Sequence, residues 1–129
     1  MDRKILVVDD QEPIRNMLEM AFIKNSYTVQ SAESAEQALE ILKQENIQVM
    51  FLDLKLPGMN GIDLCRQIRK DKPIALIYAI TGYSSLFELA DCREAGFDDY
   101  FTKPFELKVV LKAAEDAFKK IDRWKEQQV

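Results

Sequence analysis

The sequence predicts a doubly wound α/β domain, in which five helices cover a single five-stranded parallel sheet with strand order 2-1-3-4-5. Residues 49–52 and 74–80 are continuously apolar, which is typical of strands buried between two helix layers. Segments with helical spacing of apolar residues alternate with these and three shorter strand-like stretches, as in repeated strand-helix-strand units. Right-handed crossovers restrict the winding, and order 2-1-3-4-5 is the common compact solution.

Length and composition favour one domain. The chain has 129 residues, of which 47% are apolar and 31% charged, which suits one core with a hydrated surface. We expect the domain to occupy residues 1–129, with a core from 4 to 121 and a last helix that extends to about 126. The net charge of −4 is spread along the chain, and without a basic stripe we expect no nucleic-acid partner.

Several classes of protein and site are excluded by what the sequence lacks. It has no secretory signal and no membrane-length apolar run, so we expect a cytoplasmic protein without a membrane partner. Cys65 and Cys92 lack the further cysteine or histidine ligands of a zinc site, and we expect reduced core thiols. The chain contains no histidine, which excludes serine-histidine and cysteine-histidine catalysis.

The first half of the chain predicts two strand-helix pairs. Lys4–Val8 is a short apolar strand, and Pro13 suits the first turn of the helix after it. Thr28–Ser31 is a weak strand, and Ser34 with Gln37 forms a capping box that opens a second helix. The apolar stripes of these helices are Ile14, Met17, Leu18, Ala21 and Phe22, and then Ala35, Ala38, Leu39 and Leu42.

The second half continues the alternation. After the strand at 49–52, a loop at 56–61 leads to a third helix, and the strand at 74–80 precedes a helix capped by Ser85 and Glu88. Asp99–Thr102 is a brief fifth strand before a long amphipathic helix. The apolar residues of the third helix are Leu64, Cys65 and Ile68, and those of the fourth are Leu86, Leu89 and Ala90. Those of the last helix are Leu107, Val110, Leu111, Ala114, Phe118 and Ile121. Trp124 lies beyond this spacing, so we expect it to be exposed or at a partner surface.

Five polar side chains follow strands of the predicted sheet, namely Asp9, Asp10, Asp53, Thr81 and Lys103. The carboxyl ends of parallel strands meet at one edge, where ligands bind in such sheets. Two carboxylates about 5 Å apart repel by about 3 kcal/mol at an effective dielectric of about 20, and one lysine cannot balance three of them. We therefore predict Mg²⁺ held by Asp10 and Asp53, with Asp9 in direct contact or acting through water.

A cation at this edge would allow a phosphoryl group to bind. Lys103 could neutralise a second phosphoryl oxygen and the Thr81 hydroxyl could donate to a third, while backbone N–H groups near Leu54 and Gly82 complete the site. The sequence thus predicts a phosphoryl-transfer site whose nucleophile is Asp53.

Four motifs occur at these strand ends: D-D at 9–10, D-L-K-L-P-G-M-N-G at 53–61, T-G at 81–82 and K-P-F at 103–105. With these motifs the chain, from about residue 4 to 121, resembles the receiver domains of response regulators, the CheY-like, flavodoxin-like domains of two-component signalling. The resemblance implies that Asp53 accepts a phosphoryl group from a phosphohistidine of a sensor histidine kinase or histidine phosphotransfer protein.

The resemblance also implies roles for the other motif residues. Asp9 and Asp10 form the metal site together with the carbonyl of Lys55, Thr81 and Lys103 form the signalling pair, and the peptide bond between Lys103 and Pro104 is cis. The domain would accept and slowly lose its own aspartyl phosphate, and so it would not be a turnover enzyme.

Phosphorylation of Asp53 is expected to switch a protein-binding surface. By the resemblance, Thr81 moves toward the phosphate and the aromatic ring of Tyr100 turns inward. The change reshapes the face formed by the fourth helix, fifth strand and fifth helix, where a downstream protein would bind. Lys55 and Tyr83 each lie two residues after a site residue, and their bulk suggests a long-lived phosphate.

Three other functions were weighed against this one. A flavodoxin-like electron carrier needs a hydroxyl- and glycine-rich loop after the first strand, which D-D-Q-E-P is not. An aspartyl-phosphate hydrolase places its nucleophile after the first strand and needs more chain. A binding module with a receiver fold that is never phosphorylated stays open, as does whether the chain acts alone or within a longer protein.

Overall fold

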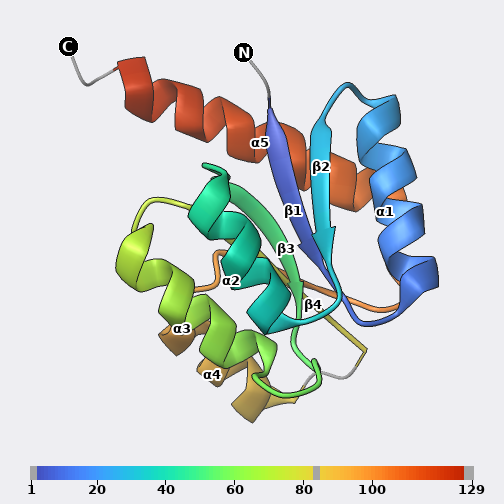
Figure 1. The fold of residues 1–129 in the computed structure, drawn as a ribbon, viewed down its shortest axis with the longest axis vertical. Coiled ribbons are helices and arrows are strands. Elements are labelled where there is room, and N and C mark those ends of the chain that lie inside the picture. The colour runs from blue at the N-terminus through green and yellow to red at the C-terminus, as the bar shows by residue number, and fades with distance from the viewer. Residues whose placement is uncertain (1–2, 83–84, 127–129) are drawn as a thin grey trace.

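A parallel sheet between two helix layers makes up the computed structural model, which describes residues 3–82 and 85–126. The sheet has the order β2-β1-β3-β4-β5 and every strand pair is parallel, which confirms the predicted fold class (Figure 1). The strands are β1 (Lys4–Val8), β2 (Thr28–Ala32), β3 (Val49–Asp53), β4 (Leu76–Thr81) and β5 (Asp99–Thr102). The helices are α1 (Glu12–Lys24), α2 (Ala35–Gln44), α3 (Gly61–Asp71), α4 (Leu86–Ala95) and α5 (Leu107–Glu126).

Each face of the sheet has its own apolar core. On one face Phe22 of α1 and Phe118 of α5 pack against alternate residues of the strands. On the other, Ala38, Leu64 and Cys92 belong to α2, α3 and α4 respectively. All residues of β3 and β4 are buried, because helices cover both sides of them, as their continuous apolar sequences predicted.

The helix boundaries follow local sequence signals. Ser34 and Ser85 accept hydrogen bonds from the backbone N–H groups of Gln37 and Glu88, each at 3.1 Å, so the serine half of both predicted capping boxes is confirmed. Gly96 ends α4 with a φ of 105°, a left-handed conformation that favours glycine. No helix within residues 3–82 and 85–126 has both the length and the apolar character needed to cross a bilayer.

The loop after β3 is folded back tightly. The N–H of Gly61 donates to the carbonyl of Leu54 at 2.9 Å. A Cβ at position 61 would collide with the backbone oxygen of Asp53, so only glycine permits this approach. The start of α3 thereby packs directly against the end of β3, where Asp53 lies.

Two expectations about individual side chains are settled. Met17, which the spacing placed in a buried stripe, is 36% exposed, whereas Leu18 and Phe22 are fully buried. The contact of α1 with the sheet is narrow, and Leu18 with Phe22, four residues apart, fills it.

Cys65 and Cys92 are buried free thiols, as expected, and burial raises the pKa of Cys65 to about 12.

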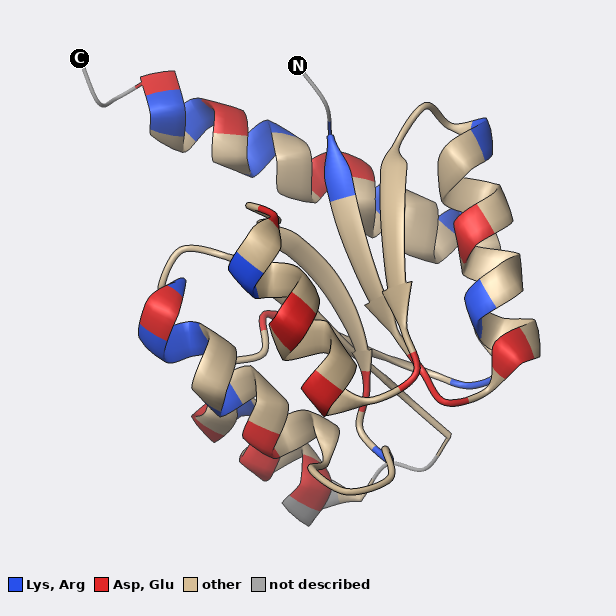
Figure 2. Cartoon of the chain, viewed as in Figure 1, with Lys and Arg blue, Asp and Glu red and all other residues tan. Residues whose placement is uncertain are grey.

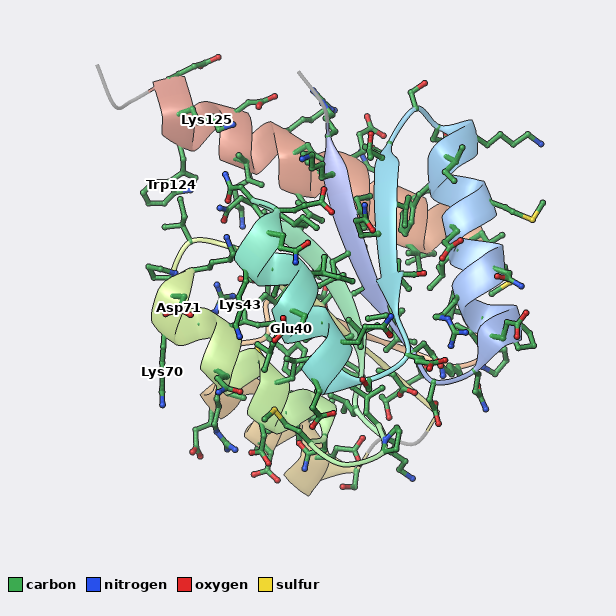
Figure 3. All side chains as sticks on the ribbon, viewed as in Figure 1. Glu40, Lys43, Lys70, Asp71, Trp124 and Lys125 are labelled. Carbon is green, nitrogen blue, oxygen red and sulfur yellow. The ribbon has the colours of Figure 1, made fainter. Side chains whose placement is uncertain are left out.

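Trp124 lies on the C-terminal part of α5 and is 57% exposed. It extends from α5 toward the chain between α3 and β4 (Figure 3). There it lines a shallow hollow together with Pro73 and Ile74. This exposure agrees with both positions expected from the sequence, since a partner surface is also exposed in the chain by itself.

Candidate functional site

The carboxyl ends of four strands bring the predicted site residues to one edge of the sheet. Asp9 and Asp10 follow β1, Asp53 ends β3, Thr81 ends β4 and Lys103 follows β5. Acidic segments directly follow β1 and lie at the end of β3, at the lower edge of the sheet in the view of Figure 2. The parallel register causes this, because Asp53 pairs with Ile80 in the neighbouring strand.

The three aspartates form a cluster in which one carboxylate oxygen of each lies within 4.8 Å of the others. Asp9 and Asp53 are only 1% and 5% exposed, while Asp10 is exposed to solvent. Carboxylates this close repel one another strongly when they are shielded from water. The cluster therefore requires positive charge nearby.

Lys103 supplies part of that charge. Its Nζ lies 2.9 Å from Asp9 Oδ2 and 3.5 Å from Asp53 Oδ2. Its backbone N–H donates to the carbonyl of Thr81 at 2.8 Å, which fixes the start of the loop. The peptide bond between Lys103 and Pro104 is cis, as the resemblance implied. The ammonium group of Lys103 is thus shared between Asp9 and Asp53.

The environment of Asp53 disfavours its ionised form. Burial is the main cause, and together with the nearby charge of Asp9 it raises the pKa of Asp53 to about 6, although Lys103 opposes the shift. The N–H of Lys55 also donates to Asp53 Oδ1, at 3.3 Å, and favours the carboxylate. Asp53 is thus mostly ionised at neutral pH, but at a free-energy cost that a second cation, in addition to Lys103, would reduce.

Two supporting residues were not recognised from the sequence. The backbone N–H of Gln11 donates to Asp9 Oδ1 at 2.9 Å, so both oxygens of Asp9 are engaged. Arg15 donates from Nη1 to the carbonyl of Asp9 at 2.8 Å. Gln11 directly precedes α1 and Arg15 lies in its first turn. Their closeness in sequence to Asp9 and Asp10 was the only available signal of this supporting role.

Thr81 is 1% exposed, and its hydroxyl donates to Glu88 Oε1 on α4 at 3.0 Å. The sequence predicted Glu88 only as part of a helix cap. We expected backbone N–H groups near Leu54 to complete the site; that of Leu54 itself donates to the carbonyl of Ile80 at 3.2 Å, as a continuation of the sheet. Gly82 is exposed at the end of β4.

The remaining predicted residues lie around this centre. The Tyr100 ring is half-buried and packs against the core shared by α2, α3 and α4. Lys55 is exposed directly after β3. Tyr83 lies outside the described residues.

Solved structures similar to this chain are receiver domains. A CheY-like response regulator receiver domain protein from Methanospirillum hungatei is 28% identical, with a TM-score of 0.89 over 98% of this chain and 99% of that chain. The receiver domain of an HD domain-containing protein from Pseudomonas fluorescens is 28% identical, with a TM-score of 0.88 over 93% of this chain and 97% of that chain.

A third similar structure, a BeF₃-activated DrrB receiver domain, is 29% identical, with a TM-score of 0.85 over 92% of this chain and 99% of that chain. The sequence itself matches the family described as the response regulator receiver domain over residues 5–115. That match covers the strands apart from Lys4, the acidic cluster, Thr81 and Lys103. The chain therefore belongs to the response regulator receiver domain family.

Proposed function

We propose that this receiver domain takes a phosphoryl group from a phosphohistidine onto Asp53, within a two-component system or phosphorelay. The donor is a sensor histidine kinase or a histidine phosphotransfer protein. The observation that carries the proposal is the cluster of three aspartates, whose carboxylate oxygens lie within 4.8 Å of one another, with Lys103 as its bonded cation. A merely structural acidic edge would not need such crowding.

The donor set of this cluster fits Mg²⁺, which prefers carboxylate, carbonyl and water oxygens. Asp10 and Asp53 would hold the ion, with Asp9 in contact or acting through water, and the carbonyl of Lys55 would be a further ligand. When bound, the ion reduces the repulsion among the acids and gives phosphoryl oxygens a positive partner.

The side chains of the site divide the chemistry among them. An oxygen of Asp53 attacks phosphorus while the phosphorus–nitrogen bond to the donor imidazole breaks, and that imidazole keeps the bonding electrons. Lys103, whose Nζ is 3.5 Å from Asp53 Oδ2, neutralises one phosphoryl oxygen, and the Thr81 hydroxyl donates to another. Water later hydrolyses the acyl phosphate, so the domain turns over only its own modification.

The alternative is a binding module with a receiver fold that is not phosphorylated. Such a module would have the same sheet and helices but would not need an acid at the end of β3. The presence of Asp53 at that position, beside Asp9 and Lys103, argues against it. Only a direct phosphorylation measurement separates the two functions.

The proposal predicts that incubation with Mg²⁺ and acetyl phosphate adds one phosphoryl group to the intact protein, as measured by mass spectrometry. The gain should vanish in Asp53→Asn, because this change removes the attacking oxyanion and leaves the size of the side chain. Asp71→Asn, at an exposed acid of α3 (Figure 3), is the matched control and should gain the same mass as wild type. An unmodified wild type, or a gain that survives in Asp53→Asn, would support the binding module instead.

We propose further that phosphorylation acts through Thr81 and Tyr100 on the face of α4, β5 and α5, where a downstream protein binds. The position of Tyr100 supports this, since its ring packs against the core on the α4 side of the sheet. Movement of Thr81 toward the phosphoryl group would vacate space for that ring.

For this switch, hydrogen exchange of the backbone amides in α4 and β5 should change on phosphorylation of wild type. The change should be much smaller in Tyr100→Ala, which lacks the ring, and should be preserved in Tyr100→Phe. Equal phosphorylation of the three proteins, measured by mass, is the control. A Tyr100→Ala protein with the full wild-type response would remove Tyr100 from the mechanism.

Lys55 and Tyr83 are proposed to slow hydrolysis of the acyl phosphate by obstructing the attacking water. Lys55→Asn should therefore shorten the half-life of phosphorylated Asp53 several-fold, measured by loss of mass after removal of the donor. Lys70→Asn, at an exposed lysine of α3 (Figure 3), should leave the half-life unchanged. The proposed role of Lys55 is wrong if both variants lose the phosphoryl group at the wild-type rate.

A further inference from the structure

One hydrogen bond joins the end of β4 to the first turn of α4. Thr81 Oγ1 donates to Glu88 Oε1 at 3.0 Å, and Thr81 is 1% exposed. The backbone N–H of Glu88 donates in turn to the N-cap hydroxyl of Ser85 at 3.1 Å. Glu88 therefore connects a site residue to the helix that contributes to the proposed switch surface.

The Thr81 hydroxyl has one proton and so serves as donor to one acceptor at a time. In the phosphorylated protein proposed above, this proton is donated to a phosphoryl oxygen. Glu88 and the phosphoryl group are therefore competing acceptors for the same donor. The resting bond from Thr81 Oγ1 to Glu88 Oε1 must therefore break before Thr81 can donate to the phosphoryl group.

The charge of the phosphoryl group also favours separation of Glu88 from Thr81. A phosphoryl group adds a charge of about −1.5 to −2, and the ends of β3 and β4 are neighbours, since Asp53 pairs with Ile80. Within the described ranges 3–82 and 85–126, no lysine or arginine forms a salt bridge with Glu88. Phosphorylation would thus withdraw the hydrogen-bond donor from Glu88 and also repel its carboxylate.

We propose that Glu88 is a positioning residue that holds the Thr81 hydroxyl on α4 in the unphosphorylated protein, and that phosphorylation of Asp53 releases it. The release loosens the first turn of α4 and so transmits the modification to the surface. The first half of this inference concerns the resting protein alone, whereas the second half rests on the proposed function.

A double-mutant cycle tests the resting bond without any phosphorylation. The free energy of unfolding is measured in urea for wild type, Thr81→Val, Glu88→Ala and the double variant. If the two side chains interact, the double variant loses less stability than the sum of the single variants. Additive losses would overturn the proposal. Ser85→Ala, which removes the cap of the same helix, should be additive with Thr81→Val.

The release is tested by hydrogen–deuterium exchange of the amides at 86–90, with and without Mg²⁺ and acetyl phosphate. In wild type, phosphorylation should speed exchange there several-fold. Glu88→Ala should exchange fast before phosphorylation and gain little from it, whereas Ser85→Ala should keep the phosphate-dependent increase above its own faster baseline. Glu88→Gln should retain part of the resting protection, because its amide oxygen still accepts from Thr81.

A Glu88→Ala protein with the full wild-type increase on phosphorylation would contradict the release. Intact mass, recorded on the same samples, separates this failure from failure of the proposed function. If wild type gains no phosphoryl group, Asp53 is not an acceptor. The double-mutant cycle then decides by itself whether Glu88 holds Thr81, and additivity there overturns the inference.

Discussion

Repulsion among three carboxylates at one edge of the sheet is the constraint on which the site depends. Asp9 and Asp53 are almost fully buried, and with Asp10 they come within 4.8 Å of one another. The ammonium of Lys103 offsets part of this charge, at 2.9 Å from Asp9 and 3.5 Å from Asp53. In the proposed function, the unbalanced remainder would give this edge an affinity for a divalent cation and, with that cation, for a phosphoryl group.

The fold holds this arrangement in place from several directions. The parallel register of β1, β3 and β4 makes their carboxyl ends coincide, so Asp53 and the acids that follow β1 lie at the same edge of the sheet. Gly61 allows the loop after β3 to pack against the backbone of Asp53, and the backbone of Lys103 is bonded to the carbonyl of Thr81.

Much of the fold could be predicted from sequence because its strongest signals are local. Continuously apolar strands at 49–52 and 74–80 indicated a sheet buried on both faces, and the strand-end acids indicated the edge at which the three aspartates cluster. Met17 was misplaced because helical spacing does not reveal how wide a contact the sheet offers. The partner of Leu54 N–H and the bond from Thr81 to Glu88 depend on register and side-chain rotation across separate elements, which spacing along the chain does not encode.

We infer that the acids are crowded at a free-energy cost which a bound cation would offset, and the free energy of unfolding reports this cost. The pKa of Asp53, at about 6, lies above its unfolded value of about 4. The folded protein thus binds this proton more tightly and loses the corresponding stability as pH rises through about 4 to 6. A difference of this size between the folded and unfolded pKa values corresponds to a loss of about 3 kcal/mol in the free energy of unfolding.

Unfolding should therefore be measured at about pH 7.5 for wild type and Asp53→Asn, in metal-free buffer and in Mg²⁺. We predict that Asp53→Asn is the more stable protein without metal, by about 1 to 3 kcal/mol, and that Mg²⁺ stabilises wild type more than the variant. An Asp53→Asn protein that is less stable than wild type, with an equal response of both to Mg²⁺, would show that the acids are not crowded at such a cost.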